Sequence, residues 1–349
     1  MLYRECKVSM AVTLKDIAVR LGVSHMTVST ALSGRGRVSE ETRKRVMEVA
    51  RDLGYRPNTS ARSMRVGRFG NIGLLLSDAV KNSYLPAGLL RGIQAELEKS
   101  DVQLTVGRMP DAMLTKAGYV PALLRHWSAD GLLINYQEGI PSRMIDLIEQ
   151  DHVPAVWLNS KQHDACVHID DHGCGRLAAE ALLQAGHTRI GYVDYSHGLE
   201  QWDTAHYSAR DRFEGARDAL ADAGLKLIDL RGARMLEGNE RKSFCRQWLS
   251  RVDRPTAVVC YSASSGIPIV LAAWRLGLEV PRDLSIVCID EHPNATLGFS
   301  FTSVLMPLEE MGHAAVQAVL RRIGDGNAGG CEAIPGHLEP GDSVVPPGA

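Results

Sequence analysis

Apolar and polar residues follow a helical spacing near the start of the chain, in the stretch VTLKDIAVRLGVSHMTVSTAL at residues 12–32. Apolar residues three and four positions apart predict two short helices, the first capped by Thr13 and ended by Gly22, the second capped by Ser24. Two helices joined by so short a turn are typical of a helix-turn-helix. The second helix would turn four side chains outward as candidate base readers: His25, Met26, Thr27 and Thr30.

A third helix is predicted from Ser39 to Leu53, with acidic residues in its first turn and Gly54 after its last apolar position. Val46 and Ala50 lie on its apolar face at core spacing. Two helices alone could equally be a hairpin whose polar face is merely solvated. Three short helices can close a small unit, and this favours the DNA-reading interpretation.

From residue 71 the pattern changes to short, near-continuous apolar runs separated by helical segments. The runs are IGLLL, VQLTV, GLLIN, PAVWL, CVHID, RIGYVD, TAVVCY and LSIVCID, and helical periods occur at residues 89–100 and 114–127. Strands that are apolar throughout are typical of parallel sheets covered on both faces. The predicted fold class is therefore an all-α helix-turn-helix head followed by an α/β body.

Composition agrees with a protein of two or three domains, since the 349 residues are 45% hydrophobic and include 33 Gly and 15 Pro. No apolar run approaches the ~20 residues of a membrane span. Residues 1–11 lack the apolar centre of a signal peptide. We therefore expect a cytoplasmic protein with no membrane partner, translated from Met1 or from Met10.

Seven cysteines are scattered through the chain without a C-x-x-C pair, so we predict reduced thiols rather than a disulfide framework. A zinc site needs four groups in tetrahedral geometry, and one cluster could supply them: His163, Cys166, His168, His172 and Cys174. The run VHID predicts a strand instead, with His168 facing away from its apolar neighbours. We expect ordinary packed residues here, no metal site and no cofactor.

Charge is distributed unevenly along the chain. Residues 1–68 contain 14 Lys and Arg against 6 Asp and Glu, whereas the remainder contains 25 against 35. A basic head on an acidic body suits a protein that holds nucleic acid with one end only.

The head and the body are joined by YRPNTSARSMRVGRFGN. Pro57 should stop the third helix, and Asn58 can cap a segment ending near Met64 that is too short to be a stable helix by itself. The alternative is a flexible linker with incidental arginines.

The head and the join resemble the DNA-binding domain and hinge of the lac repressor (LacI/GalR) family of bacterial transcription factors, through VTLKDIAVRLGVSHMTVSTAL, VSEETRKRVMEVARDLGYRPN and SARSMR. In that family the hinge becomes helical against operator DNA, and an apolar side chain wedges between base pairs in the minor groove. The resemblance implies that Met64 is this wedge. Thr30 stands where the family often has a long polar residue, and threonine offers a base less binding energy than a bidentate arginine.

The DNA contacts that the resemblance implies come from the head, the turn after its second helix, and the hinge. Besides the four outward residues of the second helix and Met64, they are Thr13, Ser24, Arg35, Asn58, Ala61 and Arg62.

The body resembles the periplasmic-binding-protein-like core of the same family, in which a ligand cleft lies between two parallel-sheet subdomains. IGLLL, VQLTV and GLLIN would build the first subdomain, RIGYVD, TAVVCY and LSIVCID the second, and FTSVLMPLEEMG would return to the first. The implied domains are a helix-turn-helix domain at residues 12–57, a hinge at 58–68, and an effector-binding and dimerisation domain at 69–349.

Candidate effector residues follow from this resemblance. Asn135 and Tyr136 stand just after the GLLI run, where α/β sheets place ligands. Arg212 matches the family's arginine before F-x-G, a donor that can bind a hydroxyl pair or a carboxylate through two hydrogen bonds. Asp290 matches an acidic residue at a strand end, a good acceptor for sugar hydroxyls. Tyr84, in KNSYL, falls where the family has a cleft wall. The alternatives are a surface helix charge for Arg212 and a helix cap for Asp290.

Departures from the family pattern change which ligand we expect. Ser262 and Ala263 replace the family's usual N-D, which removes hydroxyl-binding groups, and Tyr261 is a candidate to compensate by stacking on the ligand. NSYL likewise replaces the usual N-P-F-F. We therefore expect an effector other than a common hexose.

Other function classes find less support. No G-x-G-x-x-G, P-loop or G-x-S-x-G motif is placed for catalysis, and a transport solute-binding protein would need a signal peptide and no basic head. We predict a sequence-specific DNA-binding transcriptional regulator, a repressor, that binds a near-palindromic operator. A sugar-like effector with a preference of ~1–3 kcal/mol for one arrangement would control it, as inducer or co-repressor. The tail after Gly324 shows no leucine heptad, which favours a homodimer over a tetramer.

The hinge assignment gives a first prediction. Met64→Ala should weaken operator binding while leaving the free energy of unfolding unchanged, because alanine is too short to unstack a base step. Operator affinity is measured by fluorescence anisotropy, with chemical unfolding as the control. Unchanged operator affinity would reject the wedge role.

Overall fold

The computed structural model describes most of the chain, namely residues 12–33, 36–55, 68–79, 82–114, 129–161, 164–296, 298–326 and 329–348. The chain divides into two compact units, residues 1–69 and 70–349. We call the first the head and the second the body, and describe each by itself.

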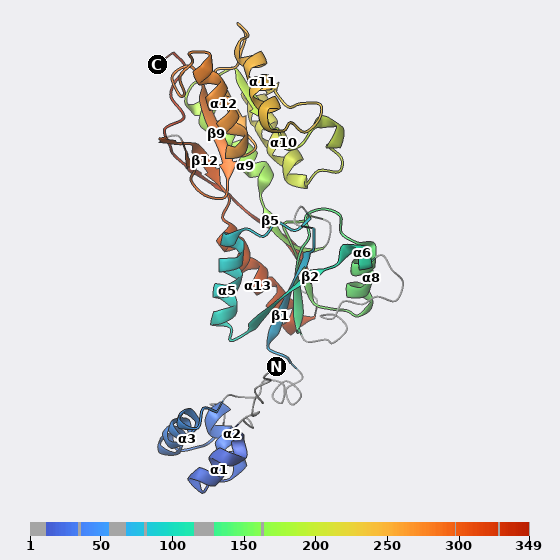
Figure 1. The fold of residues 1–349 in the computed structure, drawn as a ribbon, viewed down its shortest axis with the longest axis vertical. Coiled ribbons are helices and arrows are strands. Elements are labelled where there is room, and N and C mark those ends of the chain that lie inside the picture. Colours follow the sequence, from blue (N-terminus) through green and yellow to red (C-terminus); the bar gives the residue numbers. More distant parts are fainter. Residues whose placement is uncertain are drawn as a thin grey trace, which may run out of the picture. The chain divides into compact units, whose positions relative to one another are not determined.

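The head contains the three expected helices, α1 (Leu14–Leu21), α2 (His25–Ser33) and α3 (Glu40–Asp52) (Figure 1). Thr13 begins α1 with a reciprocal capping box, in which its side chain accepts from the Asp16 N–H and its own N–H donates to the Asp16 carboxylate at 2.7 Å. The three helices pack around a common core, so the predicted closed unit is confirmed.

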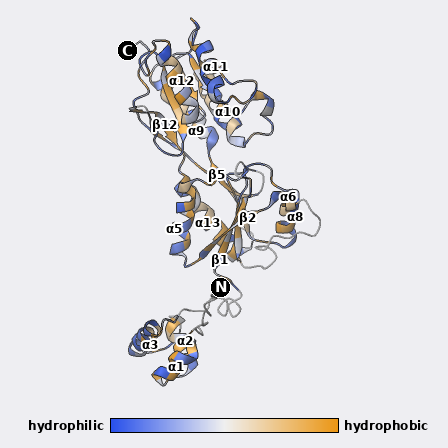
Figure 2. Cartoon of the chain, viewed as in Figure 1, coloured by the Kyte–Doolittle hydropathy of each residue, from blue (hydrophilic) through white to orange (hydrophobic). Residues whose placement is uncertain are grey.

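The ends of the head helices also follow the sequence. Gly22 ends α1 in the left-handed region with φ of 66°, a conformation that costs glycine little. Ser24 Oγ accepts from the Thr27 N–H at 3.0 Å, and Ser39 Oγ accepts from the Thr42 N–H at 3.2 Å, so both serines cap helices. In Figure 2 α3 is coloured mainly hydrophilic, and Val46 and Ala50 supply its buried face.

The body contains two sheets, each with six described strands. The first sheet has the order β13-β5-β4-β3-β1-β2 and is parallel throughout. Its strands are β1 (Asn71–Ser77), β2 (Gln103–Met109), β3 (Gly131–Asn135), β4 (Ala155–Leu158), β5 (Ala165–Ile169) and β13 (Gly330–Ile334). Its helices are α5 (Ala87–Lys99), α6 (Asp111–Leu114), α8 (Ser142–Gln150) and α13 (Leu308–Asp325). We call this sheet with its helices the first lobe.

The second sheet has the order β14-β12-β9-β8-β6-β7, in which only the pairing of β14 with β12 is antiparallel among the described strands. Its strands are β6 (Ile190–Val193), β7 (Ile228–Asp229), β8 (Ala257–Cys260), β9 (Ser285–Asp290), β12 (Thr302–Leu305) and β14 (His337–Glu339). Around it lie α9 (Asp171–Gln184), the 3-10 turn η2 (Leu199–Gln201), α10 (Tyr207–Asp222), α11 (Gly238–Leu249), α12 (Ala263–Arg275), and the hairpin β10 (Ala295–Thr296) and β11 (Phe299–Ser300). This is the second lobe.

Each apolar run of the sequence therefore forms a strand, and the predicted fold class is confirmed. One prediction needs correction. FTSVLMPLEEMG was expected to return to the first lobe, but Thr302–Leu305 is still a strand of the second sheet, and the return begins after it, with α13. The helix expected at residues 114–127 lies almost wholly outside the described residues.

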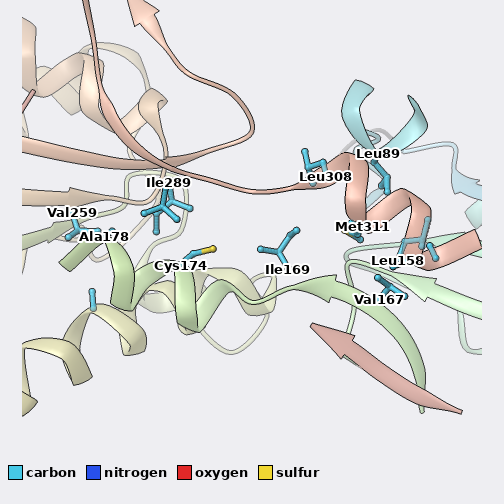
Figure 3. Close-up of a cluster of buried hydrophobic side chains, with 14 of the residues drawn as sticks. Leu89, Leu158, Val167, Ile169, Cys174, Ala178, Val259, Ile289, Leu308 and Met311 are labelled. Atoms are coloured by element: carbon cyan, nitrogen blue, oxygen red, sulfur yellow. The ribbon is translucent and has the colours of Figure 1, made fainter. Parts of the chain in front are cut away.

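The chain passes between the lobes three times, after β5, after β12 and after β13 (Figure 1). The apolar core continues along these crossings. Figure 3 shows members of one buried cluster from Ala178 and Cys174 on α9, past Ile169, to Leu308 and Met311 on α13. The lobes thus share packed side chains at the crossings as well as a covalent connection.

The prediction of reduced thiols is wrong for one pair. Cys166 on β5 and Cys331 on β13 are direct register partners, with Cα atoms 4.4 Å apart, and form a disulfide. Their separation of 165 residues hides this proximity in the sequence. Four other cysteines of the described chain are free and buried, as expected: Cys174, Cys245, Cys260 and Cys288.

None of the helices in the described part of the chain is both long enough and apolar enough to span a membrane.

Gly175 of α9 and Gly215 of α10 allow two helix backbones to touch. A Cβ at Gly175 would collide with the backbone oxygen of Arg212, and one at Gly215 would collide with that of His172. The close approach of α9 and α10 brings Asp171, on the first turn of α9, against Arg212. Backbone packing in the second lobe therefore builds the ion pair described below.

The close approach predicts that Gly215→Ala destabilises the protein by ~1–3 kcal/mol, because the added methyl must separate α9 from α10. Gly324→Ala is the matched control. A Cβ at Gly324 meets no atom within 4 Å, and alanine there should stabilise α13 slightly. Urea unfolding measures both variants, and equal stabilities would contradict the packing role.

Candidate functional site: the cavity between the lobes

A cavity of about 320 Å³ lies between the two lobes of the body. Its walls come largely from residues at or just beyond the carboxyl ends of the parallel strands, the usual ligand position in α/β sheets. The lining residues are Tyr84, Pro86, Gln137, Glu138, Asn159, Ile169, Asp171, His197, His206, Ser208, Arg212, Tyr261, Ser262, Ile289, Asp290, Glu291, Met306 and Leu308.

Arg212 lies at the base of this cavity as a buried cation. Its Nε donates to Asp171 Oδ1 at 2.6 Å, its Nη1 to the Tyr261 carbonyl at 2.8 Å, and its Nη2 to Met306 Sδ at 2.8 Å. The side chains of Arg212 and Asp171 are only 6% and 1% exposed. The surface-charge alternative for Arg212 is therefore wrong.

Burial is the largest single influence and lowers the pKa of the Arg212 guanidinium, but the charge and hydrogen bond of Asp171 together with Tyr261 and Tyr192 outweigh it, and the pKa is raised. Arg212 thus stays charged, and Asp171 balances it. This pair sets the charge of the cavity floor.

The Tyr261 ring packs against neighbouring lining residues and does not form an open wall of the cavity. The Arg212 guanidinium lies 4.4 Å from the centroid of its ring, and the His197 ring meets it edge-on at 4.9 Å. Its hydroxyl lies 2.8 Å from Ser208 Oγ. The ring that we expected to stack on a ligand is thus already packed against Arg212 and His197.

His206 continues the hydrogen-bond chain that runs from the Tyr261 hydroxyl through Ser208. Its Nε2 lies 2.9 Å from the Asn159 carbonyl, which can only accept, so Nε2 carries the proton and Nδ1 accepts from Ser208 Oγ at 2.8 Å. Burial lowers the pKa of His206, which agrees with a neutral imidazole.

Asp290 and Glu291 add two more carboxylates to the cavity wall. Asp290 Oδ2 accepts from the Ala263 N–H at 3.1 Å, at the start of α12, and Oδ1 accepts from the Glu291 N–H at 2.8 Å. Asp290 is thus a helix cap and a lining residue together. Glu291 Oε2 accepts from Tyr84 Oη at 3.3 Å, which links the two lobes, and burial raises the pKa of Glu291.

Asn135 and Tyr136 lie beside the cavity without lining it. Both are fully buried. Asn135 Nδ2 donates to the backbone oxygen of Tyr84 at 2.9 Å, and Tyr136 Oη donates to Asp111 Oδ1 at 2.7 Å. Asn135 therefore supports the segment that presents Tyr84.

Several lining residues were not among the sequence candidates, above all Asp171, His206 and Ser208. Asp171 had a usable signal, because it follows the apolar strand β5 by two residues, and the end of an apolar strand is also what made Asn135 and Tyr136 candidates. His206 and Ser208 precede Arg212 on the entry to α10 and had no such signal, since η2 and irregular chain separate them from β6.

The head presents a separate candidate surface. His25 and Met26 are exposed, with Met26 at 73%, whereas Thr27 and Thr30 are half-buried. A shallow hollow joins the beginnings of α2 and α3, and its lining includes Ser24, Met26, Thr27, Thr30, Arg37, Val38, Ser39 and Thr42. Two helix N-termini that share one hollow favour anionic groups such as DNA phosphates. The other expected DNA contacts, Arg35, Asn58, Ala61, Arg62 and Met64, lie outside the described residues.

Within the described chain, no group of three His, Cys, Asp or Glu side chains is arranged to hold a metal ion; His163 lies outside it. Of the remaining members of that cluster, Cys174 is a free, buried thiol and the other three have other contacts. His168 Nδ1 lies 2.7 Å from the Ile169 carbonyl, His172 pairs with Asp218, and Cys166 is in the disulfide.

The buried ion pair predicts a strongly non-additive stability effect. Asp171→Asn should destabilise the protein by ~3–5 kcal/mol, because it leaves the Arg212 guanidinium buried without its carboxylate. Combining it with Arg212→Met should recover most of that loss in urea unfolding. Additive losses in the double variant would contradict the pairing.

Comparison with known proteins identifies both parts of the chain. Residues 13–58 match the family model for bacterial regulatory proteins of the lacI family, and residues 179–344 match the model for a periplasmic binding protein-like domain. The described fold is similar to a crystal structure of the lac repressor dimer bound to operator and an anti-inducer, with a TM-score of 0.73 and 21% identity, over 96% of this chain and 99% of that one.

Similar sequences cover the chain almost from end to end. The transcriptional regulator AglR of Rhizobium meliloti is 31% identical over 81% of this chain and 78% of its own. The ribose operon repressor of Haemophilus influenzae is 29% identical over 90% of this chain and 93% of its own. The three-helix head, the two-lobed body and these similarities together show that the chain belongs to the lacI family of bacterial transcriptional regulators.

Proposed function

We propose that this regulator binds a small hydroxyl-bearing molecule in the cavity between its lobes, and that this binding controls how tightly the head holds operator DNA. The observation that carries the proposal is the buried Arg212–Asp171 pair on the cavity floor, since such a polar floor in a ligand-sized hollow suits a polar ligand. The ribose operon repressor among the relatives adds support for a sugar-like ligand.

The coupling rests on how the lobes are joined. The cavity takes residues from both lobes, and the Tyr84–Glu291 hydrogen bond crosses it. A ligand that contacts both walls stabilises one spacing of the lobes, and the first lobe begins at residue 71, next to the proposed hinge at residues 58–68. A difference of ~1–3 kcal/mol in ligand affinity between two lobe spacings is sufficient for a useful response.

On the DNA side, we propose a homodimer in which the heads, residues 12–57, read two half-sites of a near-palindromic operator in successive major grooves. The hinges would enter the minor groove between them. His25, Met26, Thr27 and Thr30 of α2 are the proposed base readers, and Ser24 and Ser39 stand where helix N-termini can meet phosphates.

Ser208 and His206 resemble a nucleophile with its base, but their contacts disfavour a catalytic role. Ser208 Oγ lies 2.8 Å from His206 Nδ1, but it also lies 2.8 Å from the Tyr261 hydroxyl. The other ring nitrogen of His206 meets a carbonyl rather than a carboxylate. The three groups satisfy one another, and Ser208 is nearly fully buried.

DNA binding is tested with duplexes selected from a random library. Affinity should fall by about 10³-fold or more between 50 and 200 mM salt, because two heads and two hinges displace counterions from many phosphates. Binding that is absent, or that does not change with salt, would refute DNA recognition by the basic head.

Ligand control is tested with the D171N/R212M variant, which removes the polar floor while leaving the head intact. A thermal-shift screen of sugars, polyols and sugar acids should find a ligand that shifts the melting temperature of the wild-type chain and changes its operator affinity. The variant should keep operator binding and lose that response. A normal response in the variant would contradict the cavity assignment.

A further inference from the structure

The residues that line the cavity carry more negative than positive charge. Of the described residues that line it, four carry carboxylates, Glu138, Asp171, Asp290 and Glu291, and one, Arg212, carries a guanidinium. Asp171 is committed to Arg212 through the 2.6 Å ion pair. The other three carboxylates form no salt bridge with the described residues, and the nearby charges of Arg212 and His292 offset only part of the negative charge at Glu291.

The two lining histidines do not restore the balance. His206 is held neutral by its hydrogen bonds to Ser208 and the Asn159 carbonyl. His197 Nδ1 lies 2.9 Å from Asp194 Oδ2, so any positive charge that it carries is balanced by a buried carboxylate next to it.

Arg212 offers an anionic ligand only part of its fork. Three of its five N–H groups donate to Asp171, the Tyr261 carbonyl and Met306, and its face lies on the Tyr261 ring. The charge that would attract a carboxylate or a phosphate is already paired with Asp171. An anionic ligand would therefore meet the repulsion of the acidic wall with little compensation.

Asp290 and Glu291 concentrate the negative charge at one place. They are adjacent in sequence, and both are partly buried. The Tyr84 hydroxyl donates to Glu291, so the Tyr84 ring lies beside this carboxylate. Burial raises the pKa of Glu291 and the Asp290 carboxylate raises it further, and together they outweigh the Tyr84 hydrogen bond and the charges of His292 and Arg212, which lower it. A ligand cation placed here would offset the repulsion between the two carboxylates, and Tyr84, which is 51% exposed, could add a cation–π contact.

Size restricts the ligand further. A volume of 320 Å³ is at the small end of ligand sites, which typically span ~300–1,000 Å³. Carboxylates also accept hydrogen bonds from hydroxyl groups, so the acidic wall suits a polyol as well as an amine.

We propose, building on the proposed function, that the effector is a hexose-sized polyol bearing a basic amine, an amino sugar or an aminoalditol, whose ammonium group lies between Asp290 and Glu291 beside Tyr84.

The test is isothermal titration of the full chain with two matched sets of probes. One set is glucosamine, glucose and glucuronate; the other is 1-amino-1-deoxysorbitol, sorbitol and gluconate. In at least one set the amine should bind about tenfold or more tighter than its neutral partner, the change expected for one charge-assisted contact worth ~1.4 kcal/mol, and the acid should bind most weakly. A neutral or acidic probe that binds as tightly as its amine, or a failure of both amines to bind, would overturn the proposal.

Glu291→Gln keeps the shape of the wall and removes one charge. The advantage of the amine over its neutral partner should fall at least several-fold in this variant. The matched control is Glu279→Gln, which removes an equal charge from an exposed position of the second lobe, where Glu279 pairs with Arg282. Equal loss in both variants would mean that net charge, rather than the cavity wall, causes the preference.

Operator binding separates this inference from the proposed function. An amine that binds the cavity without changing operator affinity would support the ligand class and refute ligand control. A neutral or acidic sugar that changes operator affinity while neither amine binds would refute the ligand class and leave ligand control standing.

Discussion

The ion pair between Arg212 and Asp171 is the interaction on which the arrangement of the cavity depends. Two charges can be buried this deeply only if each satisfies the other, and the contact of α9 with α10 through Gly175 and Gly215 holds them at 2.6 Å. Once Arg212 is held there, its remaining donors orient the Tyr261 carbonyl and Met306. One pair of glycines thus organises the floor of a site formed by both lobes.

The same pair also bears on the ligand class that we propose. The buried guanidinium is neutralised within the second lobe, so the charge that faces a ligand comes from the acidic residues around it. After β8, Ser262 and Ala263 stand where the family usually has N-D, and the Ala263 N–H donates to the Asp290 carboxylate. In the proposed site, recognition would rest on carboxylates that also accept hydrogen bonds from the backbone, as Asp290 does.

Local signals in the sequence predicted most of the fold, because helix caps such as Thr13 and Ser39 act within four residues and buried strands are apolar throughout. Pairing between distant segments left no such signal, so β13 and its disulfide to β5, 165 residues away, were missed. For the site, the strand-end rule located the cavity but not the direction of each side chain. The Asn135 side chain points inward and supports the segment that presents Tyr84. Asp171, which follows the end of β5, lines the cavity.

The three crossings between the lobes have a consequence for how the protein is made. Five strands of the second sheet come from the single stretch between residues 190 and 305, whereas the first sheet needs α13 and β13 from the last part of the chain. During synthesis the second lobe can nearly complete its sheet while the first lobe still lacks an edge strand and a covering helix. The first lobe, although it is begun first, is therefore completed only when α13 and β13 emerge, long after the DNA-binding head and just before β14, the last edge strand of the second lobe.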